Sequence, residues 1–166
     1  MTKLRVEGLI EQGVVYRTSH IFAAVAPTGI VYVLIRTPGV PGARVRLDYA
    51  VLSEVFARLR LYEGPDISAV GTSLTAVNMR RDVTRPAECL VYHTPTIGIG
   101  GPGTELDVDE VPGGNNAPGF PVGGRYLDPD REWVLKQDTD YLLSIENVAA
   151  LAGDVNVVPT WREGDE

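Results

Sequence analysis

The chain has 166 residues, of which 44% are hydrophobic and 22% charged, and it is rich in turn formers, with 18 glycines and 12 prolines. That length suffices for one domain with a sizeable core. A formal net charge of −7 argues against the basic face that nucleic-acid binding needs, and a single cysteine excludes both an intrachain disulfide and a cysteine-based zinc site.

The sequence offers no candidate membrane segment. A spanning helix needs about 20 consecutive apolar residues, and the nearest stretch, 21–35, is shorter and is broken by Pro27 and Gly29. Residues 1–12 carry charges where a signal peptide would have an apolar region. We therefore expect a soluble protein made in a cytoplasm, with no membrane partner.

Alternation of apolar and polar residues is the main local signal, and it is typical of strands with one buried face. The predicted strands, in chain order, are 14–16, 30–36, 44–51, 55–62, 74–79, 88–93, 106–111, 133–136, 141–146 and 155–160. Nearly every gap between them contains Gly, Pro, Asp or Asn. This spacing predicts an antiparallel all-β sandwich or barrel that spans residues 1–166 as a single domain.

Two of these strands have a helical alternative. Residues 44–51 and 55–62 alternate over a long window, but part of the same stretch also fits a 3.6-residue period, and no Gly or Pro interrupts 43–63. We favour two antiparallel strands joined around 52–54, because the alternation persists until the turn signal at 63–66.

The stretch 133–147 reads as two apolar runs around a polar turn at 137–140. It predicts either a hairpin or a corner between two core strands.

Residues 97–126 differ from the rest, because half of all the glycines lie there with almost no apolar periodicity. Long loops in compact domains are usually functional or disordered. Two interpretations stand: an arm that becomes ordered against a neighbouring subunit, or a mobile surface loop.

Within this segment, residues 98–103 match the GxGxxG dinucleotide fingerprint. That chemistry requires a helix to open at the glycines, whereas Pro102 removes a donor and the following residues do not form a helical pattern. We interpret the match as a loop.

Four carboxylates follow closely, at Glu105, Asp107, Asp109 and Glu110. The spacing lacks the glycine and closing glutamate of an EF-hand. An acidic, solvated strand or turn is favoured over an irregular calcium site.

Cys89 and His93 would lie about 13 Å apart on one strand, at about 3.3 Å per residue, so they cannot form a nucleophile and base pair directly. A pairing through His20 stays open. The sequence contains no GxSxG, P-loop or HExxH motif. We expect neither enzymatic activity nor a cofactor.

Asn78, Arg80, Arg81 and Asp82 form a polar cluster at the end of a predicted strand. The cluster is either a binding patch or a solvated turn.

Three segments, LYEGPDISAVGTSLTAVNMRRD (61–82), VYHTPTIGIGGPGTELD (91–107) and EWVLKQDTDYLLSIENVA (132–149), occur in an informative order. In order and spacing they resemble capsid cement or decoration proteins of tailed bacteriophages, which have a jelly-roll fold. The positions that carry the resemblance are Glu63, Gly64, Gly71, Thr72, Asn78, Arg80, Pro95, Gly103, Thr104, Leu135, Lys136, Thr139, Tyr141, Leu142, Leu143 and Asn147. They are mainly turn and frame positions, and 112–124 departs from the pattern.

The resemblance implies a jelly-roll sandwich of about eight strands with one long loop at 97–126. It also implies a non-enzymatic virion protein, made in the bacterial host cytoplasm, that binds the major capsid protein on the capsid exterior and cements the shell as a homodimer or homotrimer. Candidate contact residues are Asn78, Arg80, Arg81, Pro112, Asn115, Asn116, Phe120 and Tyr126.

Two other functions share this fold class. One is a carbohydrate- or receptor-binding module of a phage tail appendage, against which stand an aromatic content of 7% and the lack of an evident row of Trp or Tyr. The other is a cupin-type metalloenzyme, for which two histidines are too few unless carboxylates replace them.

Overall fold

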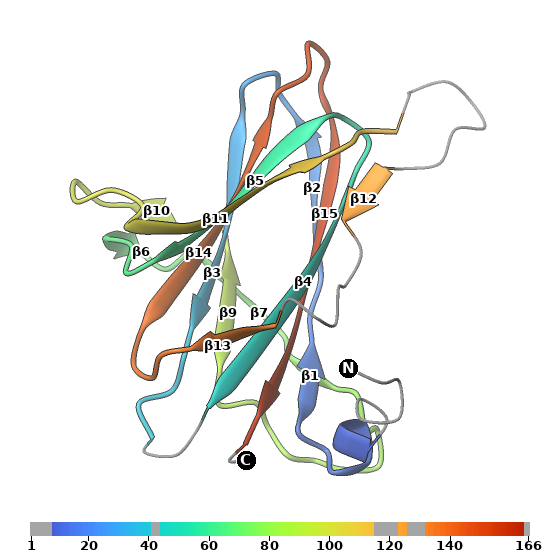
Figure 1. Ribbon diagram of the computed structural model, residues 1–166, viewed down its shortest axis with the longest axis vertical. Helices are drawn as coiled ribbons and strands as arrows, with labels where there is room; N and C mark the ends of the chain where they lie inside the picture. Colours follow the sequence, from blue (N-terminus) through green and yellow to red (C-terminus); the bar gives the residue numbers. More distant parts are fainter. Residues whose placement is uncertain (1–7, 41–43, 115–122, 126–131, 165–166) are drawn as a thin grey trace.

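The computed structural model describes residues 8–40, 44–114, 123–125 and 132–164. Residues 8–11 form one helical turn, and the remaining regular structure in these ranges is β. The strands are β1 (Val15–Arg17), β2 (His20–Val25), β3 (Ile30–Arg36), β4 (Val45–Ser53), β5 (Ala57–Glu63), β6 (Ile67–Ala69), β7 (Thr72–Leu74), β8 (Val77–Asn78), β9 (Leu90–His93), β10 (Thr96–Ile97), β11 (Thr104–Val111), β12 (Gly123–Arg125), β13 (Trp133–Leu135), β14 (Asp140–Asn147) and β15 (Gly153–Glu163) (Figure 1).

The first sheet is built around β4 and β15, which pair antiparallel over nine positions. β2 and β1 pair with successive parts of β15 and so behave as one interrupted strand. β12 and β13 pair with successive parts of β4, on the side of β4 away from β15, and so also behave as one interrupted strand. β8 completes this sheet beside β1.

The second sheet has the order β11-β5-β14-β3-β9-β7, and its neighbours are antiparallel. Among the described strands, β6 and β10 pair only with each other, in a two-stranded ribbon that projects away from both larger sheets (Figure 1).

One hydrophobic cluster fills the space between the two large sheets. It joins Leu47 and Trp161 of the first sheet to Leu61 and Leu143 of the second. Every second residue of β4 is buried from Val45 to Ser53, as expected of a strand with one face on a core. The predicted all-β, antiparallel structure is confirmed.

The boundary between β4 and β5 corrects one prediction. Both segments are strands and not a helix, but they lie in different sheets and do not pair, so the connection is a corner. The Ser53 hydroxyl donates to the Val55 carbonyl at 2.6 Å and accepts from the Val55 N–H at 3.2 Å. The Ser53 side chain thus hydrogen-bonds backbone groups of the turn and stabilises it, although the turn contains neither Gly nor Pro.

The stretch 133–147 is also a corner, because β13 pairs with β4 in the first sheet while β14 lies in the second. The predicted strand 74–79 is wrong as one element, since β7 and β8 divide it between the two sheets. β2 was missed. Its burial does not alternate cleanly, and Ala24 has a φ of 49°.

Among the described residues, no helix is long and apolar enough to cross a membrane.

Candidate binding surfaces

The first candidate is a projecting part of the chain that we call the arm from here on: β6, β10 and residues 98–103, which overlaps the predicted arm 97–126 only at 97–103. The glycine-rich residues 98–103 form a turn between β10 and β11, as the loop interpretation predicted, and not the start of a helix. The arm stands clear of the sandwich (Figure 1).

Asp66 fixes the conformation of this turn. Its carboxylate accepts from Gly100 N–H at 2.8 Å, its carbonyl accepts from Gly98 N–H at 2.7 Å, and its own N–H donates to the Gly101 carbonyl at 2.9 Å. A Cβ on Gly98 would lie 2.3 Å from the Asp66 carboxylate. Glycine at 98 therefore leaves room for the Asp66 carboxylate to reach Gly100 N–H.

Ile99 lies between these fixed glycines with its side chain fully exposed, at 107%. Ile67 and Ile97 on the ribbon are only half-buried. The arm thus holds an apolar side chain out in water on a backbone fixed by several hydrogen bonds.

The polar cluster at 78–82 divides into two roles. Asn78 is 7% exposed, and its amide nitrogen donates to the Gly13 carbonyl at 2.9 Å and to the Arg85 carbonyl at 3.5 Å. Its amide oxygen accepts from Arg80 N–H at 2.9 Å. Asn78 therefore serves the frame of the fold, and its side chain is not free to bind a partner.

Arg80 and Arg81 lie at the surface of the same turn. The Arg80 guanidinium donates to the Asp82 carboxylate at 2.9 and 3.2 Å and also to the Glu11 carbonyl. Arg80 is therefore engaged within the turn, and Arg81 is the more exposed of the two.

Part of the segment 97–126 is a strand. Residues 104–111 form β11, which confirms the strand predicted at 106–111 and shows that a single long loop over 97–126 is wrong for that part. Pro112 follows β11 and is exposed. The remaining candidates, Asn115, Asn116, Phe120 and Tyr126, lie outside the described residues.

The acidic run lies on β11, where Glu105 and Glu110 approach Arg60 and Arg58 at 3.4 and 3.7 Å. No group of three or more His, Cys, Asp or Glu among the described residues is placed to hold a metal ion. These contacts favour the acidic strand over the calcium alternative.

The two histidines meet across the sandwich. His20 on β2 and His93 on β9 stack with ring centroids 3.8 Å apart, and Phe22 packs edge-on against His20 at 4.6 Å. Burial lowers the pKa of His20, and His93 lowers it further. Cys89 is buried in the core, where burial raises the pKa of its thiol, so it is not the partner of this pair.

The second candidate surface lies on the outer side of the second sheet. Leu142 pairs in register with Leu34, with Tyr62 next to Leu142 and Tyr92 next to Leu34. Tyr32 lies two residues before Leu34 on the same side of β3. Both leucines are 0% exposed although they point away from the core, whereas the three tyrosines are half-buried. We call these five residues the tyrosine face.

Ion pairs border the tyrosine face. Arg60 contacts Glu146 at 3.0 Å and Glu105 at 3.4 Å, and Arg58 approaches the same Glu146 at 3.9 Å. The hydrogen bond to Glu146 raises the pKa of Arg60. These guanidinium and carboxylate groups are held in place by one another.

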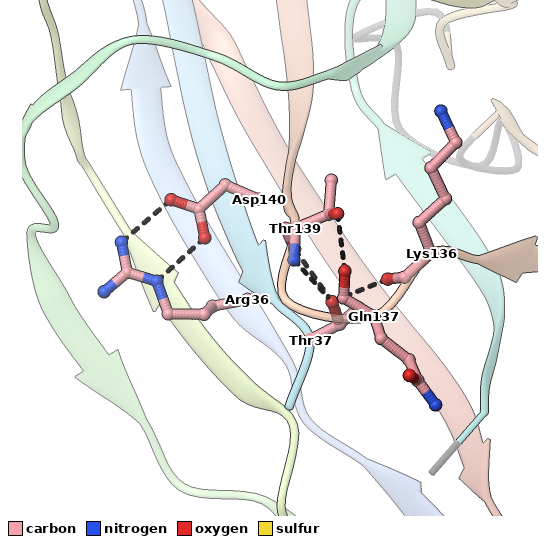
Figure 2. A network of polar contacts seen from close by, with 6 residues as sticks. All are labelled: Arg36, Thr37, Lys136, Gln137, Thr139 and Asp140. Atoms are coloured by element: carbon pink, nitrogen blue, oxygen red, sulfur yellow. Dashed lines mark hydrogen bonds and ion pairs between the residues drawn. The ribbon is translucent and has the colours of Figure 1, made fainter. Parts of the chain in front are cut away.

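A depression of about 700 Å³ adjoins this face at the end of the sheet where β14 begins. Figure 2 shows Arg36 donating through Nε and Nη2 to the two oxygens of Asp140, both at 2.8 Å. This hydrogen bonding raises the pKa of Arg36. Other lining residues include Pro65, Glu88, Leu90 and Asp138.

The turn that forms one wall of the depression is tied to the end of β3. The Thr37 hydroxyl donates to the Lys136 carbonyl at 2.7 Å and accepts from Thr139 N–H at 3.0 Å (Figure 2). Asp138 in this turn has a φ of 47°, a conformation that Asp and Asn tolerate better than most residues.

Two of the segments that carry the resemblance, 61–82 and 132–149, contact each other beside this wall. Glu63 accepts from Lys136 Nζ at 2.6 Å and from the Tyr141 hydroxyl at 2.9 Å. Hydrogen bonds from Lys136 and Tyr141 lower the pKa of Glu63, while burial raises the pKa of Tyr141 to about 12. These residues hold the frame, as predicted for those positions.

Comparison with known proteins does not assign the chain. No protein-family model matches it, and no curated protein matches it significantly.

The tyrosine face was missed from sequence because its tyrosines come from three strands. Only Tyr62 shows a signal in the sequence, because it follows Arg58 and Arg60 on the polar side of its strand, whereas Tyr32 and Tyr92 share their side with Leu34 and Leu90. Their proximity depends on a strand order that alternation does not reveal.

Proposed function

We propose that this chain is a structural protein of a tailed-phage virion, with a jelly-roll fold, that binds the outer surface of the capsid and cements neighbouring shell subunits. In this role the protein acts by binding, without catalysis or a cofactor. Its partners are the major capsid protein and further copies of itself.

The strand order supports the jelly roll. With β1 and β2 taken as one strand, and β12 and β13 as another, the frame consists of eight strands. Lettered B to I along the chain, they give the orders B-I-D-G and C-H-E-F, which are those of a jelly roll. The strands β6 to β10 are then an insertion between E and F that extends both sheets.

The arm is the observation that carries the proposed binding role. It combines a projecting ribbon, a turn fixed around Asp66 and the fully exposed Ile99. A rigid apolar projection loses little conformational entropy when it enters a pocket on a partner, and such anchors dominate many interfaces.

Cementing also requires more than one contact. Several copies joined in a symmetric oligomer would each present an arm, and linked contacts give an avidity greater than that of any single one. We propose a homodimer or homotrimer for this reason.

The test is co-sedimentation of the purified protein with expanded capsids that lack it, together with light scattering of the free protein. The proposal predicts saturable binding at a fixed ratio to shell subunits, and shells that rupture at a higher temperature when decorated. A folded protein that does not bind any such shell would contradict it.

A further inference from the structure

The tyrosine face and the depression lie next to each other on the outer side of the second sheet. Tyr92 and Leu142 lie two residues along their strands from Leu90 and Asp140 of the depression, on the same side of the sheet, at about 7 Å. Across the sheet, Tyr62 and Tyr92 are separated by three strand spacings, about 14 Å. The surface is therefore longer than one sugar ring.

We propose that this surface binds a neutral oligosaccharide, with the tyrosine rings stacking on the apolar faces of the sugars and the Arg36–Asp140 pair and Asp138 binding hydroxyls in the depression. Tyrosine offers a flat apolar ring together with a polar tip. A fixed guanidinium and carboxylate supply donors and acceptors side by side, which matches neighbouring hydroxyls on a sugar.

Charge favours a neutral ligand. Among the described residues, the depression is lined by one cation, Arg36, and three carboxylates, those of Glu88, Asp138 and Asp140. Because Arg36 is already paired in bidentate fashion with Asp140, an acidic sugar would face uncompensated negative charge.

The same features argue against a protein partner at this surface. Protein interfaces centre on an apolar core that becomes buried, but Leu34 and Leu142 are already 0% exposed here. The volume of about 700 Å³ lies in the range of pockets that hold small ligands.

This inference goes beyond the proposed shell binding and uses another part of the molecule. Tyr92→Ala is expected to leave capsid binding unchanged, whereas Ile99→Ser is expected to leave sugar binding unchanged. Failure of one proposal is thus distinguishable from failure of the other.

The test is a calorimetric titration with hexasaccharides of glucose, mannose and N-acetylglucosamine, with hexagalacturonate as the acidic comparison, followed by backbone amide NMR. We expect saturable binding of at least one neutral hexasaccharide, with shifts at Tyr32, Tyr62 and Tyr92, and no measurable binding of the acidic one. Absence of binding by every neutral probe, or shifts confined to another surface, would overturn the proposal.

Variants separate a binding role from a structural one. We expect Tyr92→Ala to weaken binding about tenfold, Tyr92→Phe to keep most of it because the ring remains, and Leu151→Ala on a distant turn to change nothing. Asp138→Asn tolerates the same backbone and should weaken binding by removing a carboxylate. A folded Tyr92→Ala protein with unchanged affinity for the sugar would refute the proposal. The proposal would also be refuted if the wild type bound no sugar and Tyr92→Ala lost capsid binding.

Discussion

Asn147 shows how a single buried side chain can organise two turns. It is 0% exposed, and its amide nitrogen donates to the carbonyls of Val25 and Leu151, both at 2.8 Å, while its oxygen accepts from Ala149 N–H at 2.9 Å. Asn147→Ala would leave these backbone groups unpaired. We expect a loss of about 2–4 kcal/mol in the free energy of unfolding, measured by urea denaturation.

Asn156→Ala is the matched control for that measurement. The Asn156 side-chain oxygen is buried but accepts no hydrogen bond from the part of the chain that the structure describes. Its removal should change the free energy of unfolding by less than about 1 kcal/mol. Equal losses in the two variants would contradict the role given to Asn147.

The stacked histidines predict that the free energy of unfolding depends on pH near neutrality, above the pH range in which carboxylates titrate. Because burial and His93 lower the pKa of His20, the folded state binds fewer protons than the unfolded state. This part of the stability is present above the unfolded pKa of about 6.5 and is lost as the pH falls below it.

Chemical denaturation between pH 7.5 and 5.5 measures this effect, with His20→Gln as the comparison. The wild-type free energy of unfolding should fall over that range more steeply than that of the variant. Parallel pH profiles would show that the pair does not couple to folding.

At the scale of elements, the arm depends on Gly98. Alanine there would bring a Cβ to 2.3 Å from the Asp66 carboxylate, so the carboxylate must move and give up its hydrogen bond to Gly100 N–H. We expect Gly98→Ala to speed hydrogen exchange of the 98–101 amides and to increase cleavage in limited proteolysis. The thermal unfolding midpoint should move little, because β6 and β10 pair with each other and with no other strand that the structure describes.

Gly8→Ala serves as the control, because a Cβ there meets nothing within 4 Å. It should leave exchange in the arm at the wild-type rate. If Gly98→Ala also leaves that exchange unchanged, the turn is not held by Asp66 as described.

The elements that sequence predicted well are the longer apolar strands. β3 was predicted with its observed bounds, and β4 and β14 nearly so. Alternating burial explains this for β4, whereas β3 and β14 contain runs of consecutive buried residues. The corner at Ser53 was not predicted, since its turn depends on a side-chain hydroxyl. The ribbon was also missed, because its short strands bury too little to leave a pattern.

At the scale of the whole molecule, alternation predicted the class of fold but not its topology, for which the resemblance to decoration proteins was the source of the jelly-roll expectation. Alternation specifies which residues face the core, while pairing order depends on contacts between distant segments, such as Leu142 with Leu34. The same limit applies to the sites. Residues 98–103 could be interpreted as a loop, but the exposure of Ile99 and the assembly of the tyrosine face follow only from three-dimensional contacts.

The most direct measurement of the central claim is quantitative co-sedimentation of the wild type, Ile99→Ser and Leu151→Ser with capsids that lack the protein. Leu151 is a matched control, because it is also exposed, at 63%, but lies on a turn of the sandwich. We predict saturable binding by the wild type and Leu151→Ser, and a loss of about tenfold or more in affinity for Ile99→Ser. Equal binding by all three proteins would contradict the role of the arm, and absence of binding by the folded wild type would contradict the capsid function itself.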